Sequence, residues 1–139
     1  MPTTLNTSAA ADISAFEGLG YGVVCKPVTL VVSANPTAGT SVGMLKIPAG
    51  AIVFDLFALA SDMDTNGTPT MSFSVGTDAS PSYFLNTSVI PQTGGAARPA
   101  GTARPLTFAN ADTINITWNA AAASFAAGTI DLSVLYVNP

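Results

Sequence analysis

Histidine is absent from the 139 residues, and cysteine occurs once, at Cys25. The lack of histidine excludes Ser-His-Asp catalysis, histidine-ligated zinc and most proton shuttles. A single cysteine forms no internal disulfide, and a catalytic thiol needs a neighbouring base to activate it. Because Cys25 follows Val23 and Val24, we predict that it is a buried small hydrophobic residue. These absences predict a protein that is not an enzyme and holds no cofactor.

Charged residues are also scarce, at 9% of the chain against about 25% in an average soluble domain. The net charge is −4, and the basic residues lie far apart in the sequence: Lys26, Lys46, Arg98 and Arg104. Nucleic acid is excluded as a partner because phosphate binding needs clustered basic side chains. A membrane is excluded as well, since no basic amphipathic stretch occurs. The longest apolar run, residues 51–60, is also shorter than the roughly 20 residues of a membrane helix.

Paired carboxylates are the remaining catalytic option, because two of them hydrolyse glycosides when burial raises the pKa of one. Eight acidic residues are present, of which only Glu17 is a glutamate. Asp12, Asp78 and Asp112 lie among Ala, Ser, Thr and Asn, where aspartate typically forms turns. The Gly-Gly pair within residues 91–99 lacks the following Lys and Ser or Thr of a phosphate loop, and it indicates a flexible loop. We therefore assign no catalytic and no cofactor-binding residue.

The first 22 residues show neither helical nor strand periodicity. They also lack the positive segment and the apolar segment of a signal peptide, which predicts synthesis in the cytoplasm. Isolated apolar residues occur along this segment, at Leu5, Ile13, Phe16, Leu19 and Tyr21. Such residues anchor on a neighbouring subunit when a partner orders a terminal segment, and a disordered tail is the alternative. We predict an extended N-terminal arm at residues 1–22, followed by one folded domain at residues 23–139.

From residue 23 onward, short β-type runs alternate with turn residues, which is typical of a sandwich or a barrel. Eight runs are candidate strands: residues 28–33, 42–47, 51–60, 70–75, 83–85 with 88–90, 106–108, 113–118 and 129–137. Eight strands fit a jelly roll. The sequence therefore predicts an all-β fold, namely a single jelly-roll-like antiparallel β-sandwich. The alanine-rich residues 119–127 are too few for a stable helix and are expected to form a loop.

The alternation of side chains indicates which strand faces are buried. Apolar residues alternate with Thr, Ser and Asn in residues 70–75 and 113–118, so one face of each strand is predicted to be core. This alternation places Trp118 in the core. Residues 51–60 differ, because both faces would be apolar apart from Asp55. We expect a loop or a neighbouring subunit to cover the second face, and an α-helix is the rival interpretation of this run.

Hydrophobic residues make up 48% of the chain, and the surface has few charged residues to keep so apolar a chain soluble. A chain of this kind must bury apolar surface in an assembly or aggregate. Thr and Ser, which replace Lys and Glu on the polar strand faces, suit neutral hydrogen bonds between subunits. The composition therefore predicts a homo-oligomer or a larger complex.

Residues 61–67 have the D-x-D-x-N-G spacing of a calcium loop, with Asp62, Asp64 and Asn66 at the ligand positions. An EF-hand needs a glutamate at loop position 12, but Phe73 occupies that position and the flanking helices are missing. The EF-hand is therefore excluded. Because the same residues are common in turns, the sequence favours a turn without a metal. A looser calcium site, completed by another carboxylate, is the alternative.

The succession of residues 45–53, 62–65, 69–76, 83–85 and 127–136 resembles small virion proteins of tailed bacteriophages, with head decoration (cement) proteins closest in pattern. The resemblance covers residues 44–137. It implies a β-sandwich without enzymatic activity, commonly a homotrimer, synthesised in the host cytoplasm and located on the capsid surface of the virion. Its implied partner is the major capsid protein, whose subunit contacts it stabilises from outside. The resemblance transfers no functional residue.

Two further function classes remain. The main alternative is a head-fibre or tail domain that binds host-surface glycans, which needs an exposed aromatic platform. The position of Trp118 in a predicted core face disfavours that platform. A carbohydrate-active enzyme would need a close carboxylate pair, which the sequence does not indicate. Under the decoration hypothesis, the arm and residues 91–105 reach across to neighbouring subunits.

Overall fold

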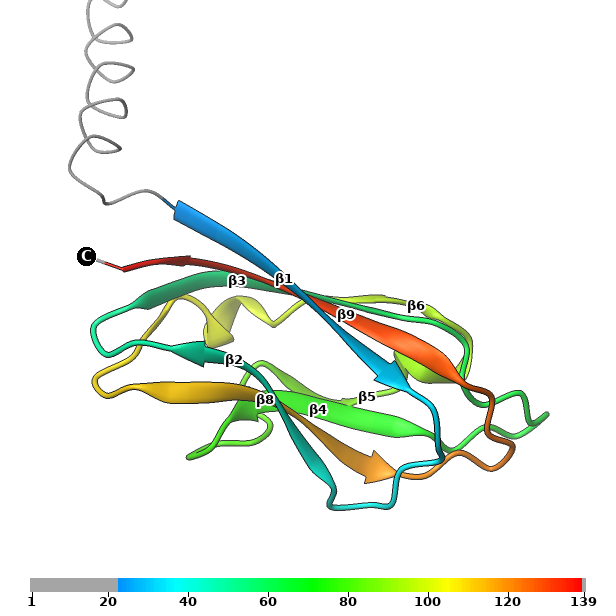
Figure 1. Ribbon diagram of the computed structural model, residues 1–139. Helices are drawn as coiled ribbons and strands as arrows, with labels where there is room; N and C mark the ends of the chain where they lie inside the picture. Colours follow the sequence, from blue (N-terminus) through cyan, green and yellow to red (C-terminus); the bar gives the residue numbers. More distant parts are fainter. Residues whose placement is uncertain (1–22, 139) are drawn as a thin grey trace, which may run out of the picture.

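The structure is a computed structural model that describes residues 23–138. Two antiparallel β-sheets pack face to face in two layers (Figure 1). The predicted arm at residues 1–22 lies outside the described residues. The elements are β1 (Val23–Val32), β2 (Ser41–Ile47), β3 (Ile52–Ala60), β4 (Ser72–Thr77), β5 (Leu85–Ser88), η1 (Ile90–Gln92), β6 (Gly95–Ala97), η2 (Gly101–Ala103), β7 (Leu106–Thr107), β8 (Asp112–Ala120) and β9 (Gly128–Val137).

The sheet topology is that of a jelly roll. One sheet has the order β1-β9-β3-β6, with the two-residue β7 also pairing with β3, and the other has the order β2-β8-β4-β5. With β7 set aside, the chain passes from one sheet to the other at every connection except the one between β4 and β5. This arrangement confirms the predicted all-β, jelly-roll-like sandwich. We refer to the two layers as the five-stranded sheet and the four-stranded sheet.

The core lies between the two sheets and draws large apolar side chains from both. Phe73 and Trp118 meet edge to face, with ring centroids 5.7 Å apart and ring planes at 69°. Leu56 and Leu132 of the five-stranded sheet are also almost fully buried. Each such side chain contributes about 1.5–3 kcal/mol when it leaves water. The prediction that Trp118 is a core residue is confirmed, because only 2% of it is exposed.

Strand β1 begins five residues earlier than predicted and includes Pro27. Proline is tolerated there because β1 is an edge strand, where one side of the backbone needs no partner. Cys25 was predicted to be buried, and the structure shows it exposed. The reason is its register, because Cys25 pairs with Leu135 in the row that points away from the core. Valine neighbours in the sequence do not indicate whether a residue of an edge strand faces the core or the solvent.

Strand β3 contains a β-bulge at Phe54, which strict alternation does not reveal. Val53 pairs with Tyr136 while Asp55 pairs with Leu135, so one extra residue is inserted between them. The insertion turns both Val53 and Leu56 into the core, where each is fully buried. Strict alternation had placed these two residues on opposite faces. Residues 52–60 form a strand, which removes the helical alternative.

Strand β4 is buried on both faces, although its alternation predicted one polar, exposed face. Ser74 is only 2% exposed, and its hydroxyl donates to Asn119 Oδ1 at 2.8 Å and accepts from the Thr87 N–H at 3.0 Å. Small hydroxyl side chains allow this close cover because they leave room and supply hydrogen bonds. Burial of the serine face is therefore a correction to the predicted alternation.

Residues 91–99 were predicted to form a flexible loop, but they contain regular structure. β6 pairs with the end of β3, so that Ala97 lies opposite Ala58. Gly94 has a φ of 74°, in the left-handed region that glycine adopts at little cost. A substitution at Gly94 would bring a Cβ to 3.3 Å from the Asp62 nitrogen. Glycine therefore also allows the backbone of residues 60–62 to pack closely against this turn. This turn is what brings the chain back along β3.

Candidate assembly surface

The outer face of the five-stranded sheet carries exposed apolar side chains beside polar ones. Opposite residues of an antiparallel pair share a face, so the partners of the buried Ile130, Leu132 and Val134 point inward and the intervening residues point outward. We define the outer face by these outward residues: Cys25, Pro27, Thr29 and Val31 of β1, Asp55, Phe57 and Leu59 of β3, and Asp131, Ser133 and Leu135 of β9. The bulged Phe54 adds an exposed ring to β3.

Exposure of large apolar side chains is concentrated there. Val31 is 69% exposed, Leu59 is 51% exposed and Phe54 is 43% exposed. On the four-stranded sheet, by contrast, the outward residues between the buried Ile114, Ile116 and Trp118 are Thr and Asn. The two outer faces of the sandwich therefore differ in chemistry, and the apolar surplus seen in the composition lies on the five-stranded sheet. Exposed apolar side chains that gather on one face of a domain are typical of interaction surfaces.

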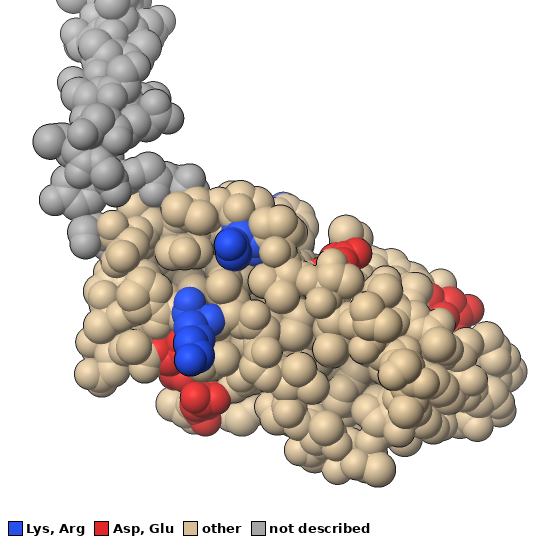
Figure 2. Space-filling view, viewed as in Figure 1, with Lys and Arg blue, Asp and Glu red and all other residues tan. Residues whose placement is uncertain are grey.

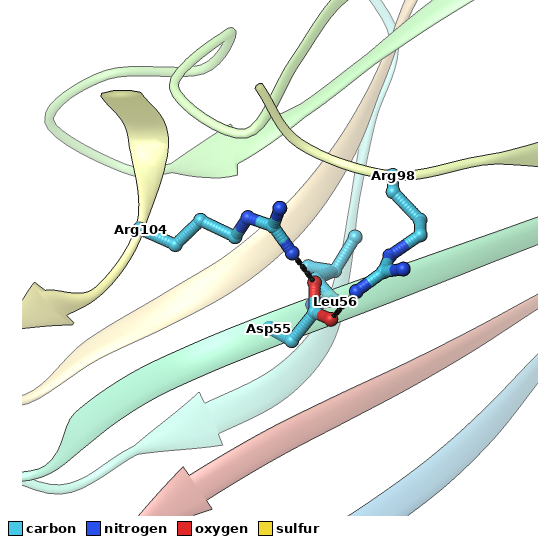
Figure 3. A network of polar contacts seen from close by, with 4 residues as sticks. All are labelled: Asp55, Leu56, Arg98 and Arg104. Carbon is cyan, nitrogen blue, oxygen red and sulfur yellow. Dashed lines mark hydrogen bonds and ion pairs between the residues drawn. The ribbon is translucent and has the colours of Figure 1, made fainter. Parts of the chain in front are cut away.

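A polar network lies on the outer face where β3 bends (Figure 3). The Asp55 carboxylate accepts from Arg104 Nη1 at 2.8 Å and from Arg98 Nη2, and the Leu56 N–H donates to the same group at 2.8 Å. The Arg98 guanidinium also lies 4.4 Å from the centre of the Phe57 ring, within the range of a cation–π contact. These contacts fix the segment between β6 and β7 against β3.

Partial burial raises the pKa of Asp55, but the hydrogen bonds from Arg98, Leu56 and Arg104 outweigh it and hold the pKa below its ordinary value. Two arginines meet one carboxylate here, so the network keeps an excess of one positive charge. Elsewhere the surface carries little charge, and Figure 2 shows one side on which uncharged residues dominate. The outer face therefore combines exposed apolar side chains with a local basic site at Arg98 and Arg104 and an acidic residue, Asp131.

The calcium-like loop is organised around Asp64, which is 1% exposed. Its two carboxylate oxygens accept four backbone N–H groups, at distances of 2.7–3.0 Å, from Thr70, Met71, Ala123 and Ser124. Burial raises the pKa of Asp64, and these four donors outweigh burial and hold the pKa far below its ordinary value. Asp64 thus ties the connection after β3 to the connection before β9.

The other two candidate ligands of the loop are used in turns. Asp62 Oδ1 accepts the Asp64 N–H at 3.2 Å, and Asn66 Oδ1 accepts the Thr68 N–H at 2.9 Å. Within residues 23–138, no three Asp, Glu, Cys or His side chains gather in a group that could hold an ion. The geometry therefore favours the turn over the calcium site.

We expect the melting temperature of the protein to be the same with and without millimolar calcium, because binding to the folded form alone would raise it. Thermal melts followed by circular dichroism test this expectation, with magnesium as the control ion. A rise in melting temperature that calcium causes, magnesium does not cause and Asp62→Asn abolishes would establish the calcium site instead.

Two of the scattered aspartates do come together. The Asp78 N–H donates to Asp112 Oδ1 at 3.1 Å, and Asp78 Oδ1 accepts from the Asn115 side chain. A cavity of about 240 Å³ lies next to them, and Tyr83, Leu106 and Asp112 are among its lining residues. Both carboxylates accept hydrogen bonds from backbone or side-chain donors, as aspartates in turns do. Of the two, only Asp112 lines the cavity. Asp12 and Glu17 lie outside the described residues.

No protein-family model and no curated protein sequence matches the chain. Solved structures do match it. A chain of the "Cyanophage Pam1 capsid asymmetric unit" is 26% identical, with a TM-score of 0.81 over 88% of this chain and 89% of that chain. A chain of the "Capsid of Ralstonia phage GP4" is 23% identical, with a TM-score of 0.74 over 85% of each chain. A chain of the acid-stable capsid of Helicobacter pylori bacteriophage KHP30 is 18% identical, with a TM-score of 0.59 over 82% of this chain and 93% of that chain.

These likenesses confirm the predicted resemblance to structural proteins of bacteriophage virions. The cyanophage chain carries most of the weight, because its likeness extends to the sequence, whereas the other two establish a shared fold.

The structure adds that none of the helical turns among the described residues is long and apolar enough to cross a bilayer. The sequence had not located the outer face of the five-stranded sheet, since the residues that form it come from three separate strands.

Proposed function

We propose that the protein is a capsid decoration, or cement, protein that binds the outside of a phage head and stabilises contacts between major capsid subunits. The observation that carries this proposal is the likeness, over most of both chains and at 26% identity, to a chain of a cyanophage capsid asymmetric unit. A sandwich with exposed apolar residues on one outer face and few charges suits a subunit that works by protein contact.

The proposed working form is a homo-oligomer, with a trimer favoured, attached to the capsid surface of the virion. Several copies held together convert each later capsid contact into an intramolecular one, so modest individual interfaces add up to very slow release. The proposed role is non-enzymatic. The paired Asp78 and Asp112 serve turns in this interpretation, and the buried Trp118 leaves no aromatic platform for a glycan at that position.

Copy number in the virion tests the proposed function. Purified particles are expected to contain hundreds of copies, in a fixed ratio to the major capsid protein, when both are quantified by mass spectrometry with labelled standard peptides. Removal of the protein from the particles, by mild denaturant or by a deletion in the phage, is expected to lower the temperature at which the heads break. A count of a few copies per particle would instead support a fibre or tail component.

A further inference from the structure

Within residues 23–138, only the segment between β6 and β7 lies on the outer face of the five-stranded sheet, against Asp55 and Phe57. Val31, Leu59 and Phe54 keep about half or more of their surface exposed, and the Arg98 side chain is 51% exposed beside them. An antiparallel sheet often has one solvated face, but that face normally carries polar residues, as the four-stranded sheet does here. The exposed apolar side chains of this face therefore call for an apolar partner.

The segment that precedes β1 has this chemistry. Residues 1–22 contain apolar side chains at intervals (Leu5, Ile13, Phe16, Leu19 and Tyr21), two acidic residues, Asp12 and Glu17, and neither lysine nor arginine. Opposite them, the network of Asp55 with Arg98 and Arg104 keeps one excess positive charge at one place on the outer face, whereas Asp131, opposite Leu59, carries a negative charge at another. The two surfaces are thus complementary in hydrophobicity, and in charge at the site of Arg98 and Arg104.

The place where residues 1–22 join β1, and the length of this segment, indicate which copy's outer face it can reach. β1 starts at Val23 opposite Val137, at the end of the sheet where the bulged Phe54 lies. A strand as long as β3 spans about 30 Å, so roughly ten extended residues would cover one sheet. Twenty-two extended residues span roughly 70 Å. The segment is therefore long enough to leave its own sandwich and cross the face of an adjacent one.

We propose that residues 1–22 of one copy lie across the outer face of the five-stranded sheet of a second copy. In this arrangement the apolar side chains of the arm contact Phe54 and Leu59, and its acidic residues face Arg98 and Arg104. The exchange buries the apolar surplus of both copies and holds them together before they meet a capsid. The inference rests on the oligomer in the proposed function, but its test needs no capsid, so its failure would leave the decoration role untouched.

The test uses the purified full-length protein and two matched substitutions. Leu59→Glu places a charge on the outer face, and Val89→Glu places the same charge at an equally exposed valine that follows β5 of the other sheet. We expect size-exclusion chromatography with light scattering to show an oligomer for the wild type and for Val89→Glu. Leu59→Glu should weaken association at least about tenfold, because a buried carboxylate without a partner is disfavoured. Val31→Glu serves as a second variant of the same face, and circular dichroism melts establish that each variant is folded.

Cross-linking identifies the occupant. A mixture of isotopically heavy and light full-length copies is cross-linked at carboxyl and amino groups, and the linked peptides are assigned by mass spectrometry. Links between residues 1–22 of one isotope and the outer face of the other support the proposal. Links only within one isotope, a monomeric wild type, or a Leu59→Glu variant that keeps the wild-type mass would each overturn it. An oligomer that persists when residues 1–20 are deleted would also overturn it, because the face would then meet another copy without the arm.

Discussion

Gly76→Ala is expected to destabilise the fold by about 3 kcal/mol or more, and the variant is expected to be largely unfolded or insoluble at 37 °C. A Cβ at Gly76 would lie 2.1 Å from the Ser80 carbonyl oxygen and 2.3 Å from the Pro81 carbonyl carbon. These are backbone atoms, so relief requires the whole turn after β4 to move. The Thr77 N–H, which donates to the Ser80 oxygen at 2.9 Å, would lose its partner in the process.

Urea unfolding followed by tryptophan fluorescence measures this effect, because Trp118 is buried against Phe73 of the same strand pair. Gly101→Ala is the matched control, since a Cβ at Gly101 meets nothing within 4 Å and its φ is not in the left-handed region. The control is expected to stay within about 0.5 kcal/mol of the wild type. Equal stability of the two variants would contradict this expectation and show that the turn after β4 moves easily to accommodate a Cβ at Gly76.

Asp64→Asn is expected to lower the melting temperature by roughly 10 °C. The substitution preserves shape, but an amide has one acceptor oxygen where Asp64 presents two oxygens to four N–H donors. The new NH₂ group would point at backbone N–H groups, which leaves buried donors without acceptors. Asp62→Asn is the control, because Asp62 is exposed and accepts a single N–H. A similar fall in both variants would assign the effect to loop charge and not to the buried contacts.

The pH dependence of the same pair follows from the depressed pKa of Asp64. A group whose pKa is lower in the folded state stabilises the protein fully above its unfolded pKa, near 3.8, and loses that contribution as pH falls through the folded pKa. The folded pKa of Asp64 lies far below 3.8, so the wild type should keep its advantage over Asp64→Asn from neutral pH to about pH 4 and lose it progressively below. Melts from pH 2 to pH 7 check this, and a constant difference across the range would contradict it.

The candidate assembly surface was only half visible in the sequence. An apolar stretch over residues 51–60 indicated a second cover, but strict alternation assigned Val53 to the wrong side because bulges have no simple sequence signal. Arg98 and Arg104 follow Asp55 by 43 and 49 residues, and only the return of the chain along β3 brings the three side chains together. Their network could not be derived from spacing, since nothing local specifies which carboxylate a distant arginine meets.

Local pattern by itself determined the class of this protein. Alternation with period two and turn residues at regular intervals are properties of neighbouring residues, and they predicted a β-sandwich. The resemblance to phage virion proteins came from the succession of particular residues between 45 and 136. The D-x-D-x-N-G stretch likewise predicted a turn. Only the tertiary structure decided that Asp64 faces inward, that Cys25 faces outward and that the apolar surplus gathers on one sheet. Those outcomes depend on the register between strands far apart in the chain, and register is set by the packing of the whole sandwich.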